Sequence, residues 1–312
     1  MMGENITNNH NAINTSRTLF KNFLYTGAIL TTFDNKINYN FRMVSFPNAK
    51  INLGLDIIEK RPDGFHSLES CFYPVQWLDV LEIIPSEDIL FTSSGIEIPG
   101  ESNHNLCIKV YNQLKKDFNL PPVQIHLYKN IPIGAGLGGG SADAAFTIKS
   151  INKLFNLNLS IAQMEDYLRP LGSDCAFFVS NKPVLAYEKG DRFKEVSLSL
   201  KDYYIYLIYP KLHISTKEAY SGVIPQKPVK KIEEIIRMDI TKWKGTLKND
   251  FEATLFPAYP ILPEIKETLY SKGAVYASMT GSGSAIYGIF TKEITLNEIF
   301  PSNFKVWRGL LQ

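Results

Sequence analysis

Alternating apolar and polar residues predict β-strands at several places along the chain. In residues 50–57, KINLGLDI, isoleucine or leucine occupies every second position, so Lys50 and Asn52 share the polar face of the predicted strand. The sequence PDG at residues 62–64 has the residue types of a turn and ends this strand. Further strands are predicted at residues 70–84, 123–130 and 203–210, and a strand–turn–strand unit at residues 274–290.

Apolar residues at helical spacing predict helices between these strands. Leu106, Val110 and Leu114 follow the helical repeat within residues 103–118. Another helix is predicted after a glycine-rich segment, with Ser141 as its N-cap. One more helix is predicted within residues 163–179, followed by a break at residues 170–172 and an apolar segment. Two further helices are predicted near residues 249–257 and 262–271. Strands and helices interleaved in this way, with hairpins, favour an α+β protein of two domains.

The composition is that of an ordinary globular protein. The 312 residues are 45% hydrophobic, and 33 basic against 31 acidic residues leave a net charge of +2. This balance gives no general attraction to nucleic acid or membranes, so an anionic partner must be met by a local site. Three well-separated cysteines match neither a disulfide framework nor a zinc site. We expect a cytoplasmic protein, monomeric or weakly homodimeric, that binds a small molecule and neither nucleic acid nor membrane.

Residues 1–42 differ in composition from the rest of the chain. They are rich in Asn and Thr, and only Glu4 and Asp34 are acidic. A short apolar run at residues 23–30 follows two basic residues, as in a targeting segment, but no clear small-residue cleavage site comes after it. We predict a poorly ordered N-terminal extension, with Met43 opening the first domain.

A glycine-rich segment carries the clearest chemical signal, because five of the seven residues at positions 134–140 are glycine. Backbone amides of such a loop, leading into a helix, bind phosphate without a lysine. The segment also fits the G-x-G-x-x-G pattern of nicotinamide dehydrogenases, but Pro132 disfavours that class of enzyme. It is not a Walker A motif, because no Lys-Ser/Thr pair follows the glycines. A second small-residue loop at residues 278–285, SMTGSGSA, fits a tight hairpin when taken alone. The two loops together favour a nucleoside triphosphate site.

Three segments together resemble the motifs of the GHMP kinases: KINLGL at residues 50–55, PIGAGLGGGSADAA at residues 132–145 and TGSGSA at residues 280–285. The resemblance implies a two-domain GHMP kinase fold of the α+β class. An N-terminal ribosomal protein S5 domain 2-like domain, which binds ATP, would span residues 43–196. A C-terminal ferredoxin-like α/β sandwich domain would span residues 197–312. The implied activity is ATP-dependent phosphorylation of an alcohol.

Two further segments narrow this resemblance to a subset of the family. RPDGFH at residues 61–66 and LGSDCAFFV at residues 171–179 are typical of the members that phosphorylate the 2-hydroxyl of 4-diphosphocytidyl-2-C-methyl-D-erythritol in the non-mevalonate isoprenoid pathway. The products implied are the 2-phosphate and ADP. A kinase for another alcohol and a catalytically silent family member are the alternatives. The RPDGFH turn disfavours the first, and the presence of Lys50 and Asp174 disfavours the second.

The resemblance also implies roles for single residues. Asp174 would accept the hydroxyl proton, and Lys50 would pair with Asp174 and orient the attacking oxygen. Taken alone, Asp174 also fits a helix cap and Lys50 a solvated strand residue. Phe65 and Tyr220 would stack on the cytosine and His66 would hydrogen-bond its edge. Phe65 stands where many relatives carry tyrosine. The predicted substrate-binding residues are Asn52, Phe65, His66 and Tyr220.

The predicted ATP-binding residues are those of the glycine-rich loop and two neighbours of the adenine: Pro132, Ile133, Gly134, Ala135, Gly136, Leu137, Gly138, Gly139, Gly140, Ser141, Ala142, Lys129 and Asn105. The second loop would add phosphate contacts from Thr280, Gly281, Ser282 and Gly283. Mg²⁺ is expected with ATP because it bridges the β- and γ-phosphates. No residue is assigned as a metal ligand. Asp143 fits either a contact to the metal or favourable charge at a helix N-terminus.

Overall fold

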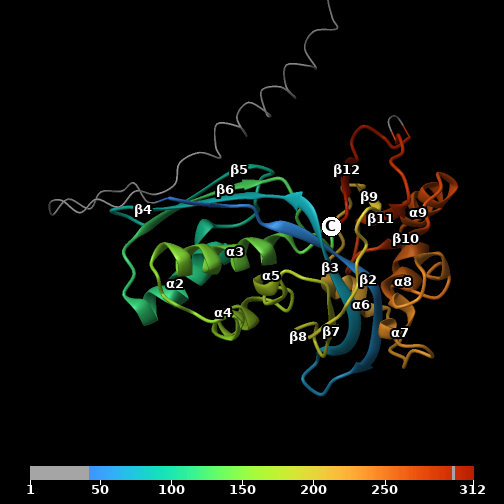
Figure 1. The fold of residues 1–312 in the computed structure, drawn as a ribbon, viewed down its shortest axis with the longest axis horizontal. Helices are drawn as coiled ribbons and strands as arrows, with labels where there is room; N and C mark the ends of the chain where they lie inside the picture. The colour runs from blue at the N-terminus through green and yellow to red at the C-terminus, as the bar shows by residue number, and fades with distance from the viewer. Residues whose placement is uncertain (1–41, 297–298) are drawn as a thin grey trace, which may run out of the picture. The chain divides into compact units, whose positions relative to one another are not determined.

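The computed structural model describes residues 42–296 and 299–312. The extension predicted for residues 1–42 therefore lies outside the described residues, apart from Arg42. Within the described part, the strands form three four-stranded sheets, and helices pack against them (Figure 1). Strands and helices are mixed along the chain, as the α+β prediction requires. Short 3₁₀ helices connect some of the elements: η1 (Ser102–His104), η2 (Arg169–Leu171) and η3 (Ile240–Lys242).

The first sheet has the strand order β1-β4-β6-β5 and is covered on one face by helices (Figure 1). Only β5 and β6 pair in parallel. The strands are β1 (Met43–Ser45), β4 (Val80–Pro85), β5 (Leu90–Gly95) and β6 (Val123–Lys129). The helices are α2 (Leu106–Phe118), α3 (Gly139–Leu154), α4 (Ile161–Leu168) and α5 (Phe177–Ser180). One buried apolar cluster joins this sheet to α2 and α3. This packing fixes the positions of β6 and α3, and the glycine-rich loop connects these two elements.

The second sheet has the order β2-β3-β7-β8, and its strands are β2 (Asn48–Lys60), β3 (His66–Leu78), β7 (Val184–Tyr187) and β8 (Arg192–Glu195). The predicted strand at residues 50–57 is confirmed as part of β2. The alternative interpretation of Lys50 as a solvated strand residue is wrong, because β2 is buried on both faces from Asn48 to Leu55. The reason is tertiary: both glycine-rich loops lie along the edge of β2, where the amides of Lys50 and Asn52 donate to Leu137 and Thr280.

The third sheet has the order β10-β11-β9-β12, with α8 and α9 beside it (Figure 1). The predicted strand–turn–strand unit is confirmed as the antiparallel pair β10 and β11. The strands are β9 (Tyr204–Tyr209), β10 (Tyr276–Met279), β11 (Ile286–Phe290) and β12 (Lys305–Leu310). The helices are α6 (Thr216–Ser221), α7 (Ile232–Ile236), α8 (Phe251–Ala258) and α9 (Ile261–Ser271). The boundary between residues 196 and 197 stays a prediction.

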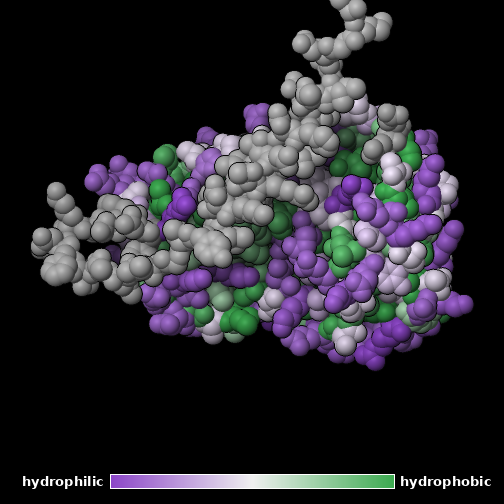
Figure 2. Space-filling view, turned by 45° about the horizontal axis from the view of Figure 1, so that its top comes forward, coloured by the Kyte–Doolittle hydropathy of each residue, from purple (hydrophilic) through white to green (hydrophobic). Residues whose placement is uncertain are grey.

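In the described part of the chain, the helices are too short or too polar to cross a membrane. On the face drawn in Figure 2, hydrophobic residues lie in small groups among hydrophilic ones.

Asp56 on β2 is expected to make stability depend on pH. Burial, together with the nearby carboxylates of Asp250 and Glu69, raises the pKa of this carboxyl to about 7. An unfolded aspartate titrates at about 3.9, so the stabilisation from protonated Asp56 is complete below that pH and is lost as the pH rises through about 7. We expect Asp56→Asn to raise the melting temperature by about 3 °C near pH 8 and to leave it unchanged near pH 4. Thermal melts at both pH values test this, and equal gains at both would contradict it.

Candidate active site

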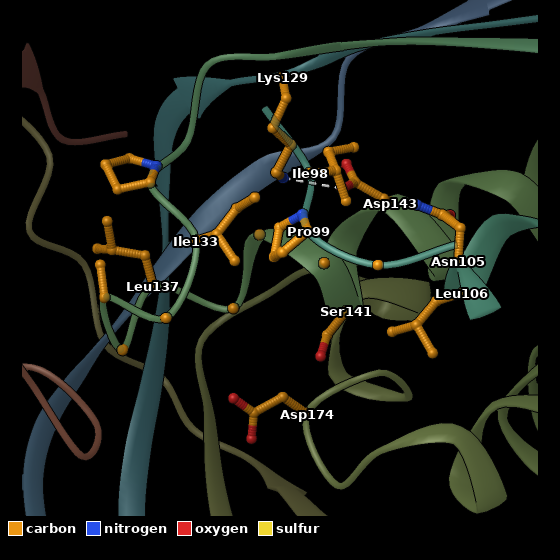
Figure 3. A pocket seen from close by; sticks show the side chains of 18 of the residues that line it. Ile98, Pro99, Asn105, Leu106, Lys129, Ile133, Leu137, Ser141, Asp143 and Asp174 are labelled. Carbon is orange, nitrogen blue, oxygen red and sulfur yellow. Dashed lines mark hydrogen bonds and ion pairs between the residues drawn. The ribbon is translucent and has the colours of Figure 1, made fainter. Parts of the chain in front are cut away.

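A cavity of about 700 Å³ lies between the glycine-rich loop and the start of α6. Its described lining includes residues 132–141, together with Lys50, Asp174 and Gly281. In Figure 3, Ile133 and Leu137 of the loop lie to the left, Ile98 and Pro99 lie near the upper centre, and Ser141 and Asp174 lie below them. The two loops that the sequence predicted as phosphate-binding therefore meet at one cavity, although more than a hundred residues separate them in the chain.

Lys50 and Asp174 form an ion pair in this cavity, with 3.2 Å between Nζ and Oδ2. The Lys50 side chain is only 3% exposed, whereas that of Asp174 is 31% exposed and can be reached from the cavity. Lys50 also donates to Asn52 Oδ1 over 2.5 Å. Asp174 is not a helix cap, because α5 begins after Ala176. A buried cation thus holds a partly exposed carboxylate, which is an arrangement suited to general-base chemistry.

Asn52 and Thr280 tie the first motif to the two loops. The amide of Asn52 donates to Thr280 Oγ1 over 3.1 Å, and this hydroxyl lies 3.1 Å from the carbonyl oxygen of Gly136. The amide of Lys50 donates to the carbonyl of Leu137 over 2.9 Å. Thr280 is completely buried, so it supports the loops from behind the cavity, while Gly281 and Ser282 lie in its wall.

Most glycines of the first loop are required by neighbouring protein atoms. Gly136 has φ +77°, and a Cβ there would overlap the carbonyl oxygen of Thr280. A Cβ at Gly134 would lie 2.8 Å from His213 Nδ1. Gly140 is the exception: a Cβ added there would have no described atom within 4 Å, and the residue lines the cavity. Close packing is therefore the physical reason for glycine at positions 134 and 136, whereas no described protein atom requires glycine at position 140, which faces the cavity.

Helix α3 begins at Gly139, so the prediction of Ser141 as its N-cap is wrong. Gly138, at φ 71°, is the N-cap, and its carbonyl accepts from the amide of Ala142 over 2.9 Å. The left-handed conformation turns the chain into the helix before Ser141 is reached. The first backbone amides of α3 have no carbonyl of a preceding helical turn to donate to, and they belong to residues that line the cavity. Free amides at the positive end of a helix dipole are groups that can bind an anion.

The predicted neighbours of the adenine both lie in the cavity wall. Asn105 caps α2, accepting from the amide of Cys107 over 2.9 Å. Lys129 is buried and pairs with Asp79 and Asp143. Ile98, Pro99 and Leu106 add an apolar wall that suits a planar base (Figure 3). Sequence reasoning missed these three and residues 213–216 as binding residues: Leu106 was predicted only as part of a helix, and no motif marks the others.

The predicted cytosine-binding residues lie together, although none of them is among the described residues that line the cavity. The rings of His66 and Tyr220 stack, with 4.7 Å between their centroids. Burial and the charge of Asp174 raise the pKa of Tyr220 to about 12. The Tyr220 hydroxyl therefore interacts electrostatically with the carboxylate that pairs with Lys50. Phe65 is 56% exposed on the adjoining turn, with the Lys189 ammonium 4.8 Å from its ring centroid.

Cys175, next to Asp174, is expected to resist alkylation in the folded protein. All three cysteines are buried, and burial raises the pKa of the Cys175 thiol to about 11. Because the thiolate is the reactive species, iodoacetamide should modify none of the cysteines near neutral pH and all of them in denaturant. Intact-mass spectrometry measures both states. Rapid labelling of the native protein would show that this segment opens.

The comparisons with known proteins agree with this geometry. Residues 105–182 match the family described as GHMP kinases N terminal domain, and residues 232–305 match GHMP kinases C terminal. The chain is 55% identical over 258 residues to a 4-diphosphocytidyl-2-C-methyl-D-erythritol kinase of Cytophaga hutchinsonii, covering 82% of this chain and 96% of that protein. A 4-diphosphocytidyl-2-C-methyl-D-erythritol kinase of Bacteroides fragilis is 52% identical over 255 residues, which cover 80% of this chain and 93% of that protein.

Solved structures of kinases with a similar fold match this chain at lower sequence identity. The crystal structure of a 4-(cytidine 5'-diphospho)-2C-methyl-D-erythritol kinase is similar, with a TM-score of 0.68 and 29% identity over 79% of this chain and 90% of that one. A homoserine kinase from Cytophaga hutchinsonii shares the fold, with a TM-score of 0.64 and 15% identity over 90% of this chain and 98% of that one. The chain therefore belongs to the GHMP kinase family, together with these 4-diphosphocytidyl-2-C-methyl-D-erythritol kinases.

Proposed function

We propose that this protein phosphorylates the 2-hydroxyl of 4-diphosphocytidyl-2-C-methyl-D-erythritol with ATP, giving the 2-phosphate and ADP. The observation that carries the proposal is the Lys50–Asp174 ion pair in a cavity bordered by both glycine-rich loops. The substrate is inferred from relatives that are more than 50% identical and bear the name of that kinase. The product would feed the non-mevalonate route to isoprenoid precursors.

In the proposed reaction, the substrate oxygen attacks the γ-phosphorus of ATP and the bond from that phosphorus to the ADP oxygen breaks. Asp174 accepts the hydroxyl proton, which is why its partial exposure matters. Lys50 holds Asp174 in place and donates to the attacking oxygen. Asn52, which accepts from Lys50, fixes the direction of the ammonium group. The chain's main contribution is thus to position the reactants and balance their charges.

The triphosphate would lie against the amides at the start of α3, where Gly140 leaves room for it. The adenine would occupy the apolar wall beside Asn105. Among the described residues, no group of three or more His, Cys, Asp or Glu side chains is placed to hold a metal ion. A Mg²⁺ ion bound together with ATP would neutralise charge on the transferred group. We leave the metal ligands of the chain unassigned.

The cytidine end would lie at the turn between β2 and β3. Phe65 would stack on the base and His66 would hydrogen-bond its polar edge. Tyr220 supports His66 by stacking, and its role as a second face for the base stays a prediction. We further propose a cytoplasmic monomer or weak homodimer, which size-exclusion chromatography with light scattering would test.

A coupled ADP-release assay with ATP, Mg²⁺ and 4-diphosphocytidyl-2-C-methyl-D-erythritol tests the proposed function. Homoserine, mevalonate and galactose serve as competing alcohols. Turnover of the cytidine substrate alone is the expected result. Turnover of a different alcohol would keep the kinase and refute the substrate. ATP binding without turnover of any alcohol would indicate a catalytically silent family member.

A further inference from the structure

Three charged side chains form a buried cluster beside the phosphate-binding loop. They are Asp79, Lys129 and Asp143, and each is at most 4% exposed. Figure 3 shows Lys129 reaching toward Asp143 at the back of the cavity. The proposed phosphoryl transfer does not use the pairing of these groups. Burying three charges is expensive, so their arrangement calls for a physical explanation.

The cluster holds both ends of the loop. Asp79 lies where the chain passes from β3 to β4, and its Oδ1 accepts from the amides of Asn130 and Ile131 over 2.6 and 2.8 Å. These amides begin the loop. Asp143 lies in α3, just after the loop ends, and accepts from Lys129 Nζ over 2.8 Å. Lys129 also donates to Asp79 Oδ2, so it joins the two ends through one ammonium group.

The two carboxyl groups differ in how many hydrogen bonds they accept. Asp79 accepts three, from Asn130, Ile131 and Lys129, all of which favour its ionised form. Asp143 accepts one, and its buried Oδ1 has no hydrogen-bond partner among the described residues. With both groups ionised, the cluster would carry a buried net charge of −1 next to the binding site of a triphosphate.

We propose that Asp79 and Lys129 form an ion pair that fixes the phosphate-binding loop in its ATP-binding conformation, and that Asp143 joins this pair as a neutral, protonated carboxyl. Burial is the main cause that raises the pKa of Asp143 to about 7. The Lys129 ammonium lowers this pKa and the Asp79 carboxylate raises it. The other groups that face the cluster are the Cys107 thiol on α2, near Asp143, and Lys305 on β12, near Asp79.

Two consequences follow from this assignment. The loop is ordered before ATP arrives, so binding does not have to order it. The cluster carries no net negative charge, so it does not repel the triphosphate. Asp79, Lys129 and Asp143 thereby act as positioning residues for the loop rather than as groups that touch the reacting atoms.

Asp79→Asn and Asp143→Asn make a matched pair of variants, because each replaces one carboxyl of the cluster by an amide of nearly the same shape. Leu114→Ala on α2 is the control, since it removes buried apolar packing without touching the cluster. For each protein, calorimetry measures the Kd of a non-hydrolysable Mg–ATP analogue, and thermal melts measure stability.

We expect Asp79→Asn to weaken nucleotide binding by about tenfold or more, because it leaves Lys129 buried without an ionised partner. Asp143→Asn should weaken binding by less than about threefold, because an amide resembles the neutral carboxyl. Leu114→Ala should lower the melting temperature without weakening binding. An Asp79→Asn protein that fails to fold while Asp143→Asn folds would also support the proposal.

Equal losses of affinity in the two Asn variants would overturn the assignment of the proton to Asp143. A tenfold loss in Asp143→Asn alone would do the same, whether or not Asp79→Asn folds. If Asp79→Asn binds the analogue as tightly as Leu114→Ala, the ion pair does not position the loop. The statements about ATP rest on the proposed function. Should the wild type bind no nucleotide, that function fails, and the difference in melting temperature between the two Asn variants still tests the cluster.

Discussion

Asp174→Asn is expected to lower the rate of phosphoryl transfer by about 10²–10⁴-fold while ATP still binds. The amide keeps the shape of the side chain but cannot accept the hydroxyl proton. The Lys50 ammonium, 3.2 Å from Oδ2, would then face a neutral group. Single-turnover kinetics with saturating ATP measure the chemical step, and calorimetry measures nucleotide affinity.

Lys50→Met should give a loss of similar size, because it removes the cation that orients Asp174 and the attacking oxygen. Its stability must be checked, since Lys50 is buried and contacts Asn52 and the Phe72 ring. Asp88→Asn, a change at an exposed acid, is the matched control and should turn over at the wild-type rate. Wild-type turnover in a folded Asp174→Asn protein would show that another group accepts the proton.

Gly136→Ala is expected to destabilise the protein by about 3 kcal/mol, one of the larger effects for a single substitution. The added methyl group would overlap the backbone of Thr280, and backbone atoms cannot move aside as the end of a side chain can. The positive φ of residue 136 adds strain for any residue with a Cβ. Urea denaturation measures the free energy of unfolding.

Gly140→Ala is the contrasting substitution in the same loop. No described atom lies near the added methyl group, and position 140 is in α3, where alanine is favoured over glycine. We expect its stability to match or exceed that of the wild type, while the affinity for ATP falls because the methyl group enters the space of the phosphates. A Gly140→Ala protein that binds ATP normally would place the triphosphate elsewhere in the cavity.

Local patterns in the sequence were enough to predict many of the elements. The alternation at residues 50–57, the helical spacing after residue 103 and the glycine turn between β10 and β11 depend on neighbours in the chain, and all three predictions are confirmed. The helix start at Ser141 was wrong, because Gly138 in the left-handed conformation ends the loop earlier. A capping residue type marks a helix start only when its own backbone is outside the helix, and Ser141 already lies within α3.

The sequence by itself determined the strands and helices that flank the loops, and its motifs indicated the GHMP kinase family. Only the tertiary structure decided that Lys50 is buried, that most loop glycines are packed against protein, and that Lys129 is shared by two carboxyl groups. The physical reason is distance along the chain. Contacts such as Gly136 with Thr280, or Lys129 with Asp79, join segments that no local periodicity connects. Burial and charge at the site depend on those contacts.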